Sequence, residues 1–168
     1  GSDDAGVEQD ALCIDALEDP ERLVECSLRL LQGARPQPRA GERERPDRLV
    51  DDPWAADLAG PEGMAWLAGR PEGSVLPIVI RTRYFDDWLR AVAIEGPLRQ
   101  VVLLDAGLDT RAWRLPWPAG TVVYELDRAN LLDVKARTLS SAAADPACDR
   151  RPVAADLASD WRVALCAA

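Results

Sequence analysis

The chain has 168 residues, enough for one domain with a substantial core, and a net charge of −9 from 29 acidic and 20 basic side chains. A chain this acidic is not expected to bind nucleic acid, because phosphate contacts need a basic face. No apolar run has the length of a membrane span, and the absence of histidine excludes a Ser-His-Asp triad and a histidine-bound metal.

The cysteines indicate a reducing compartment. They lie at Cys13, Cys26, Cys148 and Cys166, and none belongs to a C-x-x-C pair. Cysteines in this arrangement are expected to be reduced thiols. No signal-peptide pattern opens the chain. We therefore predict a cytoplasmic protein that binds neither nucleic acid nor a membrane.

Residues 1–44 are predicted to combine a mobile acidic N-terminus, a helix and a loop. The helix is predicted between Pro20 and Gly33 from apolar residues at helical spacing, namely Leu23, Cys26, Leu30 and Leu31. Residues 34–48 are rich in Pro, Arg and Glu, which is typical of a linker or mobile loop. The five arginines of this loop indicate either an anion-binding strip or a solvated surface, and the interleaved glutamates favour the solvated surface.

Residues 45–98 are predicted to be mainly helical. Asp51-Asp52-Pro53 has the pattern of a helix start, with an acid at the cap and proline in the first turn. A second helix is predicted from Val75 to Ile94, with an apolar stripe of Tyr84, Phe85, Trp88, Leu89 and Val92. The opposite, solvent-facing side is expected to carry Arg83, Asp86, Asp87 and Arg90.

Arg81 differs from these charged residues, because positions 81, 85, 88 and 92 share one side of the predicted helix. An arginine on a core-facing stripe needs an anionic partner or a binding site. The periodicity leaves two interpretations open. Either Arg81 forms a structural ion pair with a carboxylate such as Asp105 or Asp109, or it holds an anionic ligand.

The stretch from Val101 to Asp127 predicts a strand, a turn, a short helix and a second strand. Residues 101–104 are an apolar run typical of a strand covered on both faces, and Gly107 permits a positive φ in the turn that follows. The second strand, 121–126, ends in Asp127, which lies 20 residues after Gly107. In doubly wound sheets an acid at this spacing meets the ribose hydroxyls of a nucleotide-like cofactor. The turn has a single glycine, which disfavours NAD.

The rest of the chain predicts a helix and a third strand. The helix, 128–139, is expected to face the sheet through Leu131, Leu132 and Leu139, with Lys135 reaching the rim of the sheet. The strand, 151–155, ends at Asp156-Leu157, again at the carboxyl edge where ligands bind. Asp156 has a structural alternative as the cap of a helix starting near Ala158. Glu125 competes with Asp127 for the ribose, and Asp127 is preferred because it ends its strand.

Several short sequence segments resemble those of a known family. They are RPDRLVDDPWA (45–55), RTRYFDDWL (81–89), AGLDTRAWRL (106–115), VVYELD (122–127) and VAADLASDW (153–161). In this order they resemble the leucine carboxyl methyltransferase family, and more closely its bacterial branch of S-adenosylmethionine-dependent O-methyltransferases. The resemblance implies the N-terminal half of an α/β, Rossmann-like class I methyltransferase fold with strand order 3-2-1. Residues 45–98 would form a helical cap and residues 99–168 the first half of the cofactor domain.

The resemblance also implies a set of S-adenosylmethionine contacts. Arg81 would meet the carboxylate of the methionine moiety, and the turn at Ala106 and Gly107 would approach the cofactor. Asp127 would hold the ribose. Asp156 would accept a hydrogen bond from the adenine amine, with the amide of Leu157 against the ring. One departure is Asp105, where the family usually has a small residue.

The implied activity is methyl transfer from S-adenosylmethionine to a carboxylate or hydroxyl of a small molecule, such as a secondary metabolite, or of a peptide. No residue is assigned a catalytic role, because none is a convincing base and a carboxylate acceptor needs none. The alternative is a truncated or degenerate methyltransferase-like protein with a non-catalytic binding or interaction role. A nucleotide or NAD binder is the third, disfavoured interpretation.

The resemblance stops before the fourth strand of the methyltransferase sheet. Residues 101–104 would then present an open apolar edge, which proteins avoid. The chain is therefore expected to be a fragment, one half of an assembly or a degenerate form. We expect it to form a homo-oligomer, to pair with a missing C-terminal half, or to bury the edge under its own helix at 20–33.

Overall fold

A computed structural model describes residues 38–71 and 73–168 in full and the backbone of residues 23–27. Four strands form one parallel sheet, in the spatial order β1 (Leu23–Ser27), β2 (Gln100–Leu104), β3 (Val122–Asp127) and β4 (Asp149–Ala154). The expectation of a mixed α/β protein with three parallel strands in these regions is confirmed. Residues 101–104 of β2 form an unbroken apolar run because helices cover both faces of this central strand.

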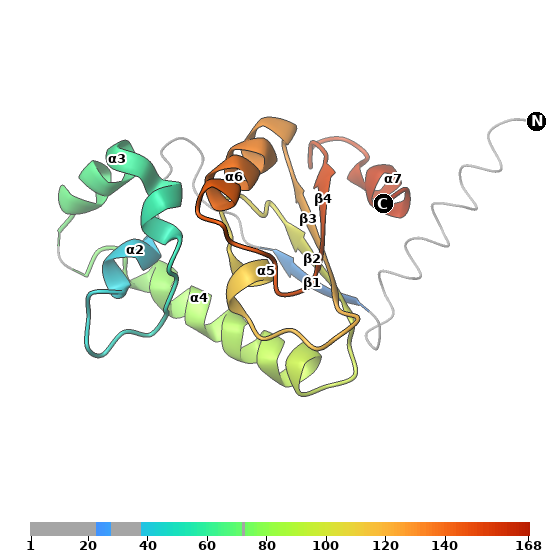
Figure 1. Ribbon diagram of the computed structural model, residues 1–168, viewed down its shortest axis with the longest axis horizontal. Helices are drawn as coiled ribbons and strands as arrows, with labels where there is room; N and C mark the ends of the chain where they lie inside the picture. The colour runs from blue at the N-terminus through green and yellow to red at the C-terminus, as the bar shows by residue number, and fades with distance from the viewer. Residues whose placement is uncertain (1–22, 28–37, 72) are drawn as a thin grey trace, which may run out of the picture.

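Figure 1 shows the helices around this sheet. They are α2 (Pro38–Glu42), α3 (Ala55–Ala68), α4 (Leu76–Leu89), the π-helical turn η1 (Arg90–Ile94), α5 (Arg111–Arg114), α6 (Ala129–Ser141) and α7 (Trp161–Cys166). The α2 and α3 helices lie at one end of the molecule and α7 at the other. None of the helices in the described ranges is long and apolar enough to cross a membrane.

The two faces of the sheet have separate hydrophobic cores. On one face, Val101, Leu103 and Val123 pack in a cluster with residues of α4, η1, α5 and α6, including Leu89, Ala93, Ala112, Trp113 and Leu139. On the other face, Val102, Leu104, Leu126 and Val153 pack with Leu165 and Trp161 of α7. Alternate residues of a strand point to opposite faces, so β2 contributes to both cores. The result is a three-layer arrangement of helices, sheet and helix.

The prediction of a helix at 20–33 is wrong where the structure describes it. Residues 23–27 form β1, which pairs in parallel with β2 from Leu23↔Gln100 to Ser27↔Leu104. The edge of β2 is therefore paired rather than open. An unpaired row of backbone donors and acceptors is costly, and the ladder with β2 outweighs the weak helical spacing of the segment. The predicted acidic N-terminus at 1–19, and Leu30 and Leu31, lie outside the described residues.

Three further expectations are wrong: a loop throughout residues 34–48, an exposed Asp86 and a buried Tyr84. Within the predicted loop 34–48, residues 38–42 form α2, and Arg39 is 2 % exposed because it pairs with Asp52. Asp86, expected on the wet side of α4, is 4 % exposed, whereas Tyr84 of the expected apolar stripe is 65 % exposed. The same cause applies to Arg39 and Asp86: each is buried with a partner of opposite charge from a distant segment.

The cysteines differ in state. Cys166 is disulfide-bonded, and Cys148 is a free, half-buried thiol. The expectation of four reduced cysteines is therefore wrong for Cys166. Burial, with the charges of Glu125 and Asp149 nearby, raises the pKa of the Cys148 thiol to about 12. Because the thiolate is the reactive form, Cys148 is not a nucleophile at neutral pH.

A buried ion cluster joins α6 to the sheet. Glu125 of β3 pairs with Lys135 Nζ at 2.8 Å and with Arg150 of β4 at 2.7 Å. Lys135 also donates to the backbone oxygen of Asp109 at 3.0 Å. Both Glu125 and Lys135 have fully buried side chains, so Lys135 does not reach the rim of the sheet as expected. Burial lowers the pKa of Lys135, and the Glu125 carboxylate opposes that shift.

We predict that Glu125→Gln destabilises the fold by about 3–5 kcal/mol, because it leaves the buried Lys135 ammonium without its counter-ion. Adding Lys135→Met should restore part of this loss, since the unpaired cation is then removed. Urea unfolding monitored by circular dichroism measures both effects. Asp133→Asn, at an exposed position of the same helix, is the matched control and should change stability by less than about 0.5 kcal/mol. A Glu125→Gln variant as stable as the parent would contradict this assignment.

Candidate functional site

The turn after β2 has an unusual backbone. Asp105 and Gly107 have φ values of 55° and 49°, both in the left-handed region. Glycine adopts this conformation without cost, and aspartate is among the side chains that tolerate it. The two left-handed residues reverse the chain sharply at the carboxyl end of β2. Ala106, between them, is fully buried.

Asp127 closes this turn from the neighbouring strand. Its Oδ2 accepts a hydrogen bond from the backbone N–H of Gly107 at 2.7 Å, and its Oδ1 accepts one from the N–H of Arg128, also at 2.7 Å. The backbone N–H of Ala106 donates to the oxygen of Leu126 at 3.0 Å. The structure thus brings Gly107 and Asp127 together at the carboxyl edge of the sheet. Each carboxylate oxygen accepts one of these hydrogen bonds and has a second lone pair that can accept another.

Asp156 follows β4 at the same edge of the sheet. The N–H of Ala155 donates to the backbone oxygen of Asp127 at 3.0 Å, which places this segment beside the end of β3. Asp156 is exposed, and its Oδ1 accepts a hydrogen bond from the N–H of Ala158 at 2.9 Å. This bond closes a turn rather than capping a helix, because α7 begins only at Trp161. Leu157 is 36 % exposed.

Arg81 lies half-buried on α4. Its Nε is buried and has no hydrogen-bond partner. The expected structural alternative, an ion pair with Asp109, is not formed, since Asp109 pairs with Arg111. Within the described residues, no hydrogen bond or ion pair joins the side chains of Arg81 or Asp156 to the turn at Gly107.

Arg111 is the fully buried centre of a charged network that the sequence did not reveal. Its Nε donates to Asp86 Oδ1 at 2.7 Å, its Nη2 to the backbone oxygen of Thr82 at 3.2 Å, and its Nη1 to Asp109 Oδ2. Arg114 also pairs with Asp86. The network joins α4 to the segment that follows the glycine turn. The segment AGLDTRAWRL contains three of these residues, but nothing in it indicates that Asp86 is the partner of its two arginines.

A second buried pair fixes the turn to the N-terminal helices. Asp52 Oδ2 accepts hydrogen bonds from Arg39 Nε at 2.7 Å and from Thr110 Oγ1 at 2.6 Å. Arg39 Nη2 donates to the backbone oxygen of Leu108 at 3.1 Å. Asp52, expected as a helix cap, therefore links α2 and the start of α3 to the chain after β2. No signal in the sequence pairs positions 39 and 52.

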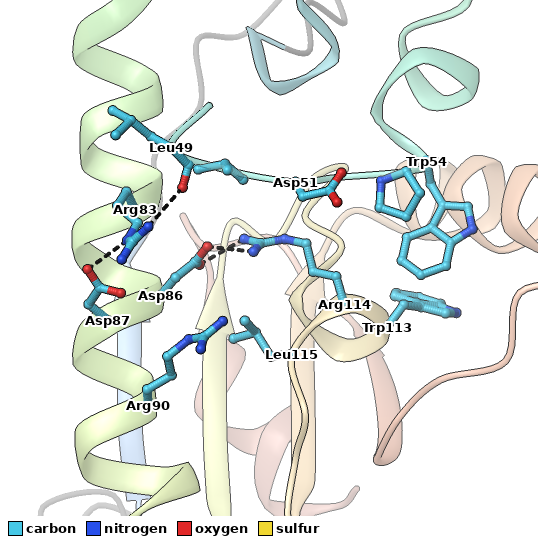
Figure 2. Close-up of a pocket in the computed structure, with 12 residues that line it drawn as sticks. Leu49, Asp51, Trp54, Arg83, Asp86, Asp87, Arg90, Trp113, Arg114 and Leu115 are labelled. Carbon is cyan, nitrogen blue, oxygen red and sulfur yellow. Dashed lines mark hydrogen bonds and ion pairs between the residues drawn. The ribbon is translucent and has the colours of Figure 1, made fainter. Parts of the chain in front are cut away.

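A cavity of about 480 Å³ lies between α4, α5 and the segment before α3 (Figure 2). Its lining combines charged, aromatic and aliphatic side chains from these three segments, namely Leu49, Val50, Asp51, Pro53, Trp54, Arg83, Asp86, Asp87, Arg90, Trp113, Arg114 and Leu115. None of the six residues predicted to contact a cofactor is among them. The cavity and the carboxyl edge of the sheet are therefore separate candidate sites on one framework.

The sequence profile of the leucine carboxyl methyltransferase family matches residues 37–168. A protein of Parafrankia sp. (strain EAN1pec) named "Putative S-adenosyl-L-methionine-dependent methyltransferase" is 47 % identical over 134 residues, which are 73 % of this chain and 43 % of that protein. Similarly named proteins of Mycobacterium bovis (strain BCG / Pasteur 1173P2) and Mycolicibacterium gilvum (strain PYR-GCK) are 42 % and 44 % identical over 147 and 140 residues.

These alignments cover 77 % and 73 % of this chain and 48 % and 45 % of the two relatives. The chain spans about half the length of the curated relatives it matches.

The Arg111 network sets the ionisation of Asp109. Burial by itself raises the pKa of Asp109, but the guanidinium of Arg111, followed by those of Arg39 and Arg114, lowers it to about 2 from an ordinary value of 3.8. Because the folded-state pKa lies below the unfolded-state value, the ionised carboxylate stabilises the fold at a pH above about 4. This contribution is lost as the pH falls from about 4 to about 2.

We predict that Asp109→Asn flattens the dependence of the unfolding free energy on pH by roughly 2 kcal/mol between pH 4 and pH 2, because the group that titrates there is removed. Urea unfolding at several pH values across this interval measures the slope. Asp133→Asn, on the surface of α6, is the control and should keep the slope of the parent. An Asp109→Asn variant with the parent's slope would show that Asp109 is not the linked group.

Proposed function

The chain belongs to the leucine carboxyl methyltransferase family, and we propose that it forms the cofactor-binding part of an S-adenosylmethionine-dependent methyltransferase. The observation that carries this proposal is the bond between the Gly107 N–H and Asp127 Oδ2. It joins a glycine turn and an acid at the carboxyl ends of adjacent parallel strands, which is where α/β sheets bind nucleotide-like ligands. The names of the relatives supply the identity of the cofactor.

We assign β2, β3 and β4 to the first, second and third strands of the class I methyltransferase sheet, in the order 3-2-1. Their parallel registers support this assignment. The helices α2, α3 and α4 are proposed to be the cap over the cofactor. Support comes from the Arg39–Asp52–Thr110 contacts, which hold this helical segment against the chain that follows the glycine turn.

The side chains at this edge fit the chemistry of the cofactor. Arg81 has a buried, unpartnered Nε, and a guanidinium matches the carboxylate of the methionine moiety. Asp127 keeps one free acceptor position on each oxygen for the ribose hydroxyls. Asp156 Oδ2 would accept a hydrogen bond from the adenine amine, and the amide of Leu157 would lie against the ring. Ala106 and Gly107 would form the floor of the site, because neither has a side chain large enough to block close approach.

When bound, S-adenosylmethionine supplies a methyl group on a sulfonium. This electrophilic methyl would be the group transferred to the acceptor oxygen. The residues of this chain would bind and orient the cofactor and exclude water from it. The proposed acceptor is a carboxylate or hydroxyl of a small molecule or peptide. In the relatives, we expect most contacts with the methyl acceptor to come from the part of their sequence that this chain does not span.

Asp105 is the departure from the family pattern in this site. Asp105 has a backbone φ of 55° in the left-handed turn that also contains Ala106 and Gly107. A carboxylate here would repel the carboxylate of the cofactor and attract its ammonium and sulfonium. Asp105 therefore sets the local charge that the cofactor meets, and Arg81 is the proposed cationic counterpart.

The test compares two ligands that differ in the group Arg81 is proposed to hold. We predict that Arg81→Gln weakens binding of S-adenosylhomocysteine about 10- to 100-fold, because a charge-assisted hydrogen bond is lost. Binding of 5′-methylthioadenosine, which has the nucleoside but no amino-acid carboxylate, should be unchanged. Isothermal titration calorimetry measures both affinities.

Arg137→Gln, at an exposed position on α6, is the matched control and should bind both ligands like the parent. Equal weakening of both ligands by Arg81→Gln would assign Arg81 a structural role. A parent chain that binds NAD and not S-adenosylhomocysteine would overturn the proposed function itself.

A further inference from the structure

We propose that the cavity between α4, α5 and residues 49–54 is a binding site for an aromatic monocarboxylate, with Arg90 as the group that holds the carboxylate. This site is independent of the proposed cofactor function, since it shares no lining residue with the six cofactor contacts. Its volume of about 480 Å³ lies within the range of small-molecule sites in proteins.

The other charges of α4 that line the cavity are already paired. Asp86 is held by Arg111 at 2.7 Å and by Arg114, whose Nη2 donates to it at 2.8 Å. Asp87 pairs with Arg83 at 2.7 Å, and Figure 2 draws this pair and the pair between Asp86 and Arg114. Each carboxylate of α4 in the cavity therefore has a guanidinium of its own. A ligand gains little from cations that are committed in this way.

Arg90 is different. Among the described residues its side chain has no hydrogen bond or ion pair, and Arg90 is an exposed residue that lines the cavity. Figure 2 shows it extending from the helix toward Leu115. It begins the π-helical turn η1, in which the N–H of Glu95 donates to the oxygen of Arg90 at 2.7 Å. Such turns are rare and are found frequently at functional sites.

The opposite side of the cavity is aromatic. Trp54 and Trp113 line it together, as Figure 2 shows. The Trp113 ring is fixed, because its Nε1 donates to the backbone oxygen of Ala144 at 3.3 Å and the Arg150 guanidinium lies 4.7 Å from its ring centroid. A rigid indole wall favours a flat apolar ligand body, since little side-chain freedom is lost when the ligand binds.

The charge of the ligand follows from the same residues. One uncommitted guanidinium matches one carboxylate, and its planar fork accepts both carboxylate oxygens. Asp51 and Asp87 also line the cavity, and their side chains are about half exposed, at 56 % and 50 %. The lining contains three aspartates and three arginines, so it has no excess of positive charge that would favour a dianion such as a phosphate monoester. The geometry therefore selects an aromatic body with a single negative charge.

Calorimetry with 2-naphthoate as the probe tests this assignment. We expect the parent chain to bind 2-naphthoate at least tenfold more tightly than 2-naphthamide, which has the same ring system without the charge. Arg90→Gln should reduce the affinity for 2-naphthoate to that of the amide. It should leave the melting temperature unchanged, because the Arg90 side chain pairs with no residue in the part of the chain that the structure describes.

Arg137→Gln removes the same charge from an exposed site outside the cavity and should bind 2-naphthoate like the parent. Three results would overturn the proposal: no binding of 2-naphthoate by the parent chain, equal binding of the acid and the amide, or an Arg90→Gln variant with undiminished affinity. Tighter binding of 1-naphthyl phosphate than of 2-naphthoate would overturn the assignment to a monocarboxylate.

Discussion

The buried guanidinium of Arg111 is the contact on which the arrangement of both candidate sites depends. Removing a charge from water is costly, and a buried arginine is stable only when its donors are satisfied. Arg111 meets this condition with Asp86, Asp109 and the backbone oxygen of Thr82. Two of these acceptors lie on α4 and one lies after the glycine turn. The guanidinium thus sets where α4 sits relative to the carboxyl edge of β2.

The two arginines that we propose as ligand-binding groups belong to this helical segment. Arg81 lies in the first half of α4, and Arg90 directly follows α4 and lines the cavity. Nine residues of helix separate them, which corresponds to roughly 13 Å along the helix axis. Both side chains project from a helix that Arg111 anchors through Thr82 and Asp86, two positions between them. A single buried network can therefore hold two binding groups in fixed positions without contacting either ligand.

The sequence predicted the parts of the fold that depend on local pattern. The apolar runs of β2 and β3 and the helix ending near Ile94 were found because strand and helix periodicities are local properties. Gly107 and Asp127 were found together because their spacing is a property of one strand–turn–strand unit. These two residues are also the ones that the structure joins directly.

What the sequence could not supply was the identity of partners from distant segments. Arg39 and Asp86 were expected at the surface, and Lys135 at the rim of the sheet, because isolated charges belong in water. Each is buried because another segment provides the opposite charge, and no periodicity encodes that pairing. The prediction of a helix at residues 23–27 was wrong for a related reason. Their spacing fits a helix, but the unpaired edge of β2 imposes a strand on them.

The position of β1 has a consequence for the order in which the sheet is assembled. Leu23 pairs with Gln100, 77 residues away, whereas Gln100 pairs with Val122 and Val122 with Asp149, at separations of 22 and 27 residues. Long loops cost more entropy to close, and contacts between distant positions form slowly. We therefore expect the three consecutive strands to form first and β1 to join an existing sheet. Among the described strands β1 pairs only with β2, so β1 should also open first, and faster amide hydrogen exchange in β1 than in β3 is the measurement that reports it.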